Sequence, residues 1–85
     1  MPYIKPDRRQ QLDPYVFALS NSIGEYGELN YAITQLCRLM HIEEPLSYTK
    51  IALLTGVLEN VKQEFYRRLA VPYEEEKAKI NGDVY

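Results

Sequence analysis

Apolar residues recur at intervals of three and four along most of this chain, in three separate ladders. The ladders consist of Leu12, Val16, Leu19 and Ile23; of Leu29, Ile33, Leu36 and Met40; and of Ile51, Leu54, Leu58, Val61, Phe65 and Leu69. Apolar positions at this spacing fall on one face of a helix with 3.6 residues per turn. The pattern predicts an all-α protein in which three amphipathic helices form an antiparallel bundle, with no sheet.

The start of the first helix is indicated by an aspartate followed by a proline. Asp13 is suited to the N-cap and Pro14 to the first helical position, so a helix is expected over residues 14–25. Because the ladder extends upstream, a start near Asp7 is the alternative. Residues 1–6, which contain two prolines, are expected to form an extended arm.

The next boundaries follow from glycine and serine. Either Gly24 or Gly27 is expected to break the chain before a second helix over residues 28–42. So short a connection predicts an antiparallel hairpin. Ser47 is a suitable cap for the long third helix, which is expected over residues 47–71.

Two further residues shape the C-terminal part. Gly56 lies in the middle of the third helix, where it is a candidate for close approach by another helix. Pro72 is expected to kink or restart the helix, because proline lacks the N–H that an α-helix requires. A shorter helix is expected over 73–81, where Asn81-Gly82 provides a left-handed stop before a tail of residues 82–85.

The length of the chain bears on its stability. Residues 1–85 are expected to form a single domain, with Leu36 and Leu58 in its core. A core of that size leaves only a few kcal/mol of net stability. Self-association is therefore an expected source of additional stability.

Charge and composition exclude some classes of function. The net charge of −2 argues against general attraction to nucleic acid or anionic lipid. No uncharged run is long enough to span a membrane. The single cysteine, Cys37, cannot form an internal disulfide, and together with an N-terminus unlike a secretory signal it favours a cytoplasmic location.

Candidate catalytic and metal-binding groups are few. Cys37 and His41 stand four residues apart, but two ligands do not make a metal site, and we expect no metal, no cofactor and no catalytic residue. Glu25 and Glu28 resemble the paired carboxylates with which all-α nucleotide pyrophosphohydrolases hold magnesium, but glycines interrupt the motif. A small magnesium-dependent nucleotide hydrolase using these residues with Glu59 and Glu64 is therefore an alternative function.

A second alternative is nucleic-acid binding. Tyr66-Arg67-Arg68 and the basic N-terminal arm interleave aromatic and basic side chains, which can stack on bases and contact phosphates. In a net acidic chain this pattern more often reflects pairing of arginine with glutamate. An accessory nucleic-acid-binding role thus ranks below protein binding.

The eight tyrosines favour a protein interface. Most of them lie off the three ladders, so a three-helix core cannot bury them all. Tyrosine combines a large apolar area with a polar tip and is enriched at interfaces. The leading hypothesis is a non-enzymatic module that forms a homodimer or tetramer, with an interface that includes Tyr31, Tyr66, Arg67, Arg68, Tyr73 and Tyr85.

The expected contact uses the third helix and the segment from Tyr66 to Tyr85, which Pro72 would turn away from its own bundle. The acidic residues Glu74 to Glu76 would then face Arg67 and Arg68 of a neighbouring copy.

Three segments carry a resemblance to a family. They are the run from Glu28 to Thr34 (ELNYAIT), the run from Glu64 to Arg68 (EFYRR), and the C-terminal part from Pro72 to Lys77 and from Asn81 to Tyr85 (NGDVY). In these segments the chain resembles a family of small uncharacterised proteins of bacteriophages and bacteria. The resemblance implies a cytoplasmic setting in a bacterial or phage-infected cell and carries no known activity.

Overall fold

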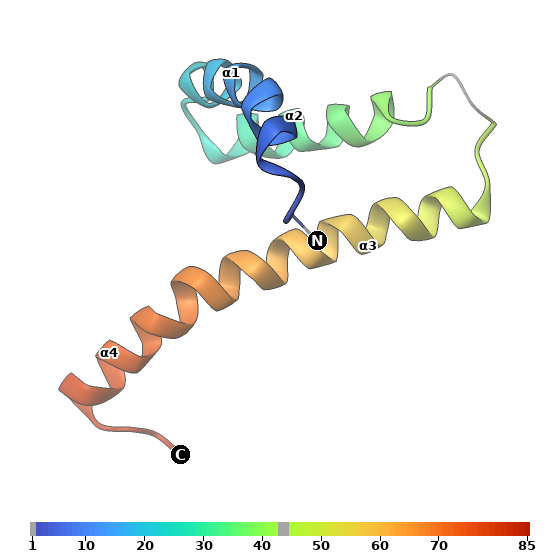
Figure 1. Ribbon diagram of the computed structural model, residues 1–85. Helices are drawn as coiled ribbons and strands as arrows, with labels where there is room; N and C mark the ends of the chain where they lie inside the picture. The colour runs from blue at the N-terminus through green and yellow to red at the C-terminus, as the bar shows by residue number, and fades with distance from the viewer. Residues whose placement is uncertain (1, 43–44) are drawn as a thin grey trace. The chain divides into compact units, whose positions relative to one another are not determined.

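Helices account for all the regular secondary structure in the part of the chain that the structure describes. The structure, a computed structural model, describes residues 2–42 and 45–85. Along the chain follow α1 (Pro6–Ser22), α2 (Tyr26–Leu39), α3 (Tyr48–Phe65), a π-helical turn η1 (Tyr66–Ala70) and α4 (Val71–Asn81) (Figure 1). The predicted all-α class is confirmed. Met1 of the expected arm and residues 43–44 lie outside the described residues.

The chain divides into two units. Residues 2–52 contain α1, α2 and the beginning of α3, and residues 53–85 contain the rest of α3 with η1, α4 and the C-terminal tail.

Helix α1 begins earlier than Asp13-Pro14 indicated. Lys5 is extended (φ −61°, ψ 146°) and Pro6 occupies the first turn, so Asp13 and Pro14 lie inside the helix. The expected start at residue 14 is wrong, and the alternative start near Asp7 is close to the observed one. Proline at residue 6 suits a helix start as well as proline at residue 14 does, and Asp7 in the first turn interacts favourably with the helix dipole.

A glutamate side chain caps helix α2. The Oε1 atom of Glu28 accepts hydrogen bonds from the backbone N–H of Gly24 at 2.6 Å and of Glu25 at 3.2 Å. These are donors that the helix itself cannot satisfy. Gly24 therefore lies in the break between α1 and α2, whereas Gly27 is helical.

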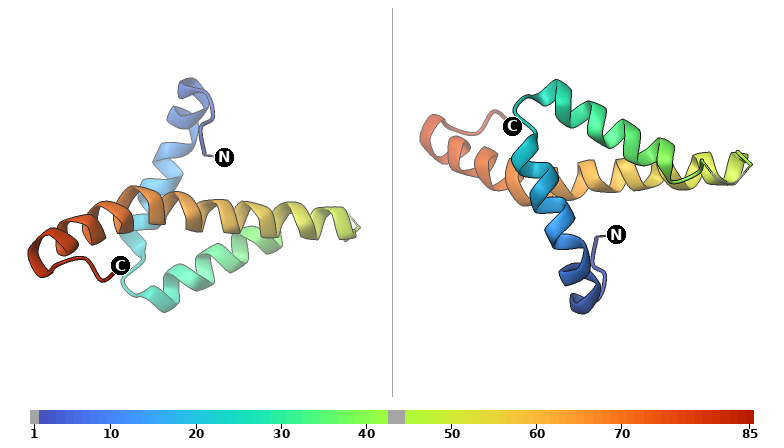
Figure 2. Two further views of the ribbon diagram at one scale, coloured as in Figure 1. Left: turned by 90° about the horizontal axis from the view of Figure 1, so that it is seen from below. Right: turned by 90° about the horizontal axis from the view of Figure 1, so that it is seen from above.

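The two helices of this unit do not form the expected antiparallel hairpin. Ile23 becomes extended (ψ 121°) directly after α1, and α1 and α2 diverge from the short connection instead of packing along their lengths (Figure 2). They approach each other near the connection, where Leu19 and Ile23 lie beside Tyr31. The predicted antiparallel bundle is therefore not confirmed.

Helix α3 begins as the sequence predicted. The Ser47 hydroxyl oxygen accepts a hydrogen bond from the Lys50 backbone N–H at 3.2 Å. A Cβ atom added at Gly56 would have no atom of the described residues 53–85 within 4 Å, so the close approach expected at this glycine is not found within its own unit.

The helix widens before Pro72 instead of breaking. The N–H of Val71 donates to the carbonyl of Tyr66, five residues back, and α4 continues through Pro72. An α-helical turn would need a hydrogen bond from residue 72, which proline cannot donate, and would press its ring against the carbonyl four residues back. Gly82, with φ 87°, ends α4 and donates its N–H to Ala78 O at 2.9 Å, so the predicted stop is confirmed.

No residue in the described part of the chain is buried. Leu36 is 54% exposed and Leu58 is 40% exposed, so the core predicted around them is not found there. None of the helices in residues 2–42 and 45–85 combines the length and apolar character that a membrane span requires.

The proline inside α1 yields a stability prediction. Pro14→Ala should restore a hydrogen bond from residue 14 to the Gln10 carbonyl, and by propensity it should stabilise α1 by up to about 3 kcal/mol. Circular dichroism should show higher helicity and a higher melting temperature. Pro2→Ala, in the non-helical arm, is the control. Unchanged helicity in the Pro14 variant would mean that α1 does not pass through residue 14.

The Glu28 cap can be tested in the same way. Glu28→Ala removes the acceptor of two backbone donors and should destabilise α2 by about 1 kcal/mol. Faster amide hydrogen exchange at Gly24 and Glu25 should accompany the loss. Glu76→Ala, an exposed glutamate of α4, should leave both amides as they are in the natural protein. Equal exchange rates in all three proteins would contradict the capping role.

Candidate functional site

The π-helical turn η1 carries three consecutive residues of the predicted interface. One of them, Tyr66, reaches across the turn, and its hydroxyl donates to Glu74 Oε1 of α4 at 2.8 Å. This hydrogen bond, with the negative charge of Glu74 beside it, raises the pKa of Tyr66 above its ordinary value. The bond joins the first residue of η1 to α4 and thus records how α4 is rotated relative to the start of the turn.

Arg67 and Arg68 share one carboxylate of their own chain. Glu64 Oε1 lies 2.6 Å from Arg67 Nη2 and 3.1 Å from Arg68 Nε. The Glu64 side chain is 26% exposed, whereas the two arginine side chains are more than half exposed. The positive charges expected to meet Glu74 to Glu76 of another copy therefore have a partner within the chain, and such exposed pairs contribute little free energy.

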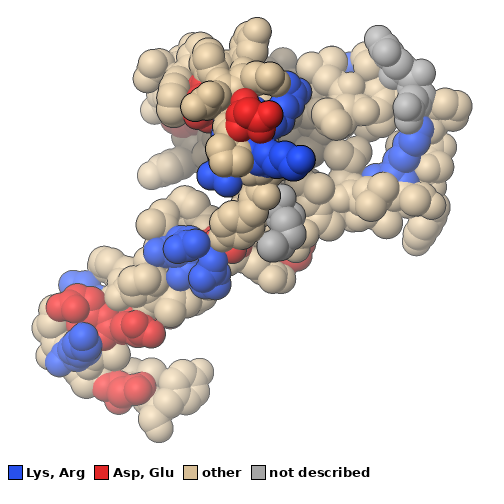
Figure 3. Space-filling model, in the orientation of Figure 1, with Lys and Arg blue, Asp and Glu red and all other residues tan. Residues whose placement is uncertain are grey.

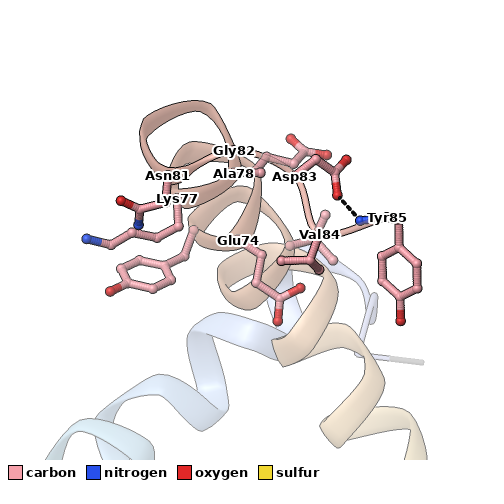
Figure 4. Close-up of a pocket in the computed structure, with 11 residues that line it drawn as sticks. Glu74, Lys77, Ala78, Asn81, Gly82, Asp83, Val84 and Tyr85 are labelled. Carbon is pink, nitrogen blue, oxygen red and sulfur yellow. Dashed lines mark hydrogen bonds between the residues drawn. The ribbon is translucent and has the colours of Figure 1, made fainter.

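The C-terminal tail and α4 form an open hollow. Beyond Gly82 the tail returns beside α4, and the backbone N–H of Tyr85 donates to Asp83 Oδ1 at 2.9 Å (Figure 4). Tyr73 and Tyr85 both line the hollow, and Lys77 Nζ lies 5.6 Å from the centre of the Tyr73 ring. The structure thus brings two of the predicted interface tyrosines to one concave surface.

An apolar groove marks the other unit. Its lining residues come from the end of α1 and from one face of α2, and they include Leu19, Ile23, Tyr31, Leu36 and Leu39. Tyr31 is 66% exposed. Of the six predicted interface residues, Tyr31 alone belongs to residues 2–52, and the other five belong to residues 53–85.

Asn30 and Thr34 form a small polar site on α2. The Thr34 hydroxyl donates to the Asn30 backbone carbonyl at 2.8 Å and lies 3.3 Å from Asn30 Oδ1. The threonine is thus engaged by the preceding turn of its own helix.

Three of the four carboxylates considered for magnesium, Glu28, Glu59 and Glu64, have structural partners. Glu28 caps α2, Glu64 binds two arginines, and Glu59 accepts a hydrogen bond from Gln63 and pairs with Lys62. The Gln63 hydrogen bond and then the Lys62 charge lower the pKa of Glu59. Within residues 2–42 and 45–85, no three Asp, Glu, His or Cys side chains are placed to hold one metal ion.

The other chemical candidates lie on α2, just beyond it, and in the N-terminal region. Cys37 is a free, half-exposed thiol on α2, and His41 lies beyond the end of that helix. Arg8 donates a hydrogen bond to Gln11 and Arg9 donates one to the Ile4 carbonyl, both within the N-terminal region.

The C-terminal segment does not present the surface charge expected of a nucleic-acid-binding protein. On the face drawn in Figure 3, acidic and basic side chains alternate along this segment, whereas nucleic acid is typically bound by a continuous basic track.

Sequence reasoning missed the π-helical turn and the role of Glu64. A signal for the turn was present, because Val61, Phe65, Leu69 and Tyr73 follow one another at steps of four. Successive steps of four drift around an α-helix by about 40° each. A run of them just before a proline is a reason to expect a wider turn.

The comparisons with known proteins give a family without an assigned role. No curated protein and no solved structure shows a significant match. A family model described as "Domain of unknown function (DUF6899)" matches residues 1–84, nearly the whole sequence. The expected membership in an uncharacterised family is thereby confirmed, and the chain belongs to the family of this domain of unknown function.

Proposed function

We propose that this protein is a non-enzymatic module that binds further copies of itself through apolar helix faces. One observation carries the proposal: in the unit of residues 53–85, the large apolar side chains other than Val84 and Tyr85 of the tail lie on one continuous helical segment and are exposed. A single helix cannot bury its own apolar face. Phe65 is 65% exposed and Leu69 56% exposed, so this unit needs a partner to cover them.

A second copy is the proposed partner because the same surface on two chains can pair around a twofold axis. The interface of the proposal includes Tyr66, Arg67 and Arg68 of η1, Tyr73 of α4 and Tyr85 of the tail. Tyr31, in the groove of the other unit, offers a second contact and with it a route from dimer to tetramer. Tyrosine and arginine are the residue types that dominate interface energetics.

The proposal includes a cytoplasmic setting in a bacterial or phage-infected cell, which the sequence resemblance supports. Neither alternative function gains a supporting observation. Glu28 serves as a cap, Glu59 pairs with Lys62, and Glu64 pairs with Arg67 and Arg68.

Removing the C-terminal segment should lower the oligomeric state. A chain that ends at residue 72 lacks Tyr73, the hollow and the tail, and it should scatter light as a smaller species than the full protein. Full-length protein at the same concentration is the control. A full-length protein that is monomeric at high micromolar concentration, or a truncated one that assembles unchanged, would contradict the proposed role of this segment.

Two substitutions on α3 test which face associates. Phe65→Asp places a charge on the ladder and should weaken association at least tenfold, because the carboxylate would be desolvated in the contact. Leu53→Asp is the matched control: Leu53 is 66% exposed, nearly as much as Phe65 at 65%, but it lies about 120° around the helix. Sedimentation equilibrium measures both. Equal weakening by the two substitutions would show that this face is not the one that associates.

A further inference from the structure

The π-helical turn changes which residues share a face with the ladder of α3. In an α-helix each step of four residues advances about 40° beyond a full turn. Over the three steps from Val61 to Tyr73 the drift would reach about 120°, which would place Tyr73 well away from the ladder. An uninterrupted α-helix would therefore give α3 and α4 apolar faces that point in different directions.

One additional residue in a turn reverses this drift. A π-helical turn closes its hydrogen bond over five residues instead of four, so the residues after it are rotated back by about 100°, the angle of one residue. Tyr73 then lies within about 20° of Val61, and Ile80, seven residues further on, lies close to the same line. The turn thus brings α4 into register with α3.

The hydrogen bond between Tyr66 and Glu74 is independent evidence for this register. Residues eight apart lie about 80° apart around an α-helix, and about 20° apart when one residue is absorbed by a wide turn. The two side chains meet at 2.8 Å. They therefore share a face, as the rotated arrangement requires.

We propose that η1 aligns the apolar residues of α3 and α4 into one continuous stripe, and that the same stripe of a second copy covers it. The stripe consists of Leu58, Val61, Phe65, Leu69, Tyr73 and Ile80, which are between 40% and 66% exposed. This inference rests on the proposed self-association and assigns it a surface and a structural cause, Pro72.

The area of the stripe explains why its continuity matters. If each side chain loses roughly 60 to 120 Å² of exposed surface in the contact, the six side chains together bury roughly 360 to 720 Å² per copy. Specific protein–protein interfaces bury at least about 600 Å² of surface per partner. The whole stripe reaches this range, whereas the half on α3 alone falls short of it.

The length of the stripe favours a second copy, rather than α1 or α2 of residues 2–52, as the partner that covers it. From Leu58 to Ile80 the stripe extends over roughly 33 Å at 1.5 Å per residue. With 17 and 14 residues, α1 and α2 are roughly 26 and 21 Å long, so neither helix covers it from end to end. The same segment of another copy has the same length and the same apolar face.

A pair of variants separates register from helix stability. Pro72→Ala supplies the missing N–H and lets the turn become α-helical, which should rotate α4 by about 100° and split the stripe. Removing Ala70 in addition takes out the extra residue and should realign α4 with α3. Pro14→Ala, the same substitution in α1, is the matched control.

Sedimentation equilibrium of the full-length proteins should give a dimer dissociation constant at least tenfold weaker for Pro72→Ala. The double variant should return to within about threefold of the natural protein, and Pro14→Ala should stay within the same range. Circular dichroism should show no loss of helix in any variant, because alanine favours helix over proline. A loss of association in Pro72→Ala would then not be due to unfolding.

Three outcomes would overturn the inference. Unchanged association in Pro72→Ala, or no recovery in the double variant, would show that register across η1 is not required while self-association itself stands. A monomeric natural protein would overturn the self-association on which the inference rests.

Discussion

The structure depends on how apolar helix faces are removed from water. A helix exposes its apolar stripe along its whole length, and only a second element can cover it, because contacts between side chains three or four residues apart remove only a small part of that surface from water. In the C-terminal unit, residues 53–85, helical residues and a short tail are all that is available. The exposed Phe65 and Leu69 follow directly from this, and so does the proposal that another copy completes the fold.

Pro72 has a larger influence than a helix-breaking residue usually has. A proline inside a helix removes one hydrogen bond and collides with a carbonyl, and a kink is the common result. Here the preceding turn widens, so that Val71 bonds Tyr66 and the helix continues. Because one extra residue is absorbed, the residues beyond the turn change face. A local backbone constraint thereby decides which side chains of α4 accompany the ladder of α3.

The acidic residues show how the same side chain serves structure or chemistry according to its neighbours. Glu28 is bound to backbone donors at the start of α2, and Glu64 is bound to two arginines one turn away. A cation site needs several oxygens directed at one point with their lone pairs available. These carboxylates are directed at N–H groups and guanidinium groups instead, and the chemistry they serve is capping and pairing.

The sequence by itself determined the helical class, the Ser47 cap, the stop at Gly82 and the family, because each depends on local periodicity, capping or residue-by-residue similarity. It did not determine where α1 begins, because Pro6 and Pro14 are both suited to a first helical turn and the choice depends on the chain around them. Only the three-dimensional structure decided that α1 and α2 diverge, that the helix widens at η1, and that Tyr66 meets Glu74. Tyr73 and Tyr85 could be selected as interface residues from their type and position, but their shared hollow could not, because it depends on the return of the tail. Periodicity reports which residues share a face only while the helix keeps 3.6 residues per turn, and at η1 it does not.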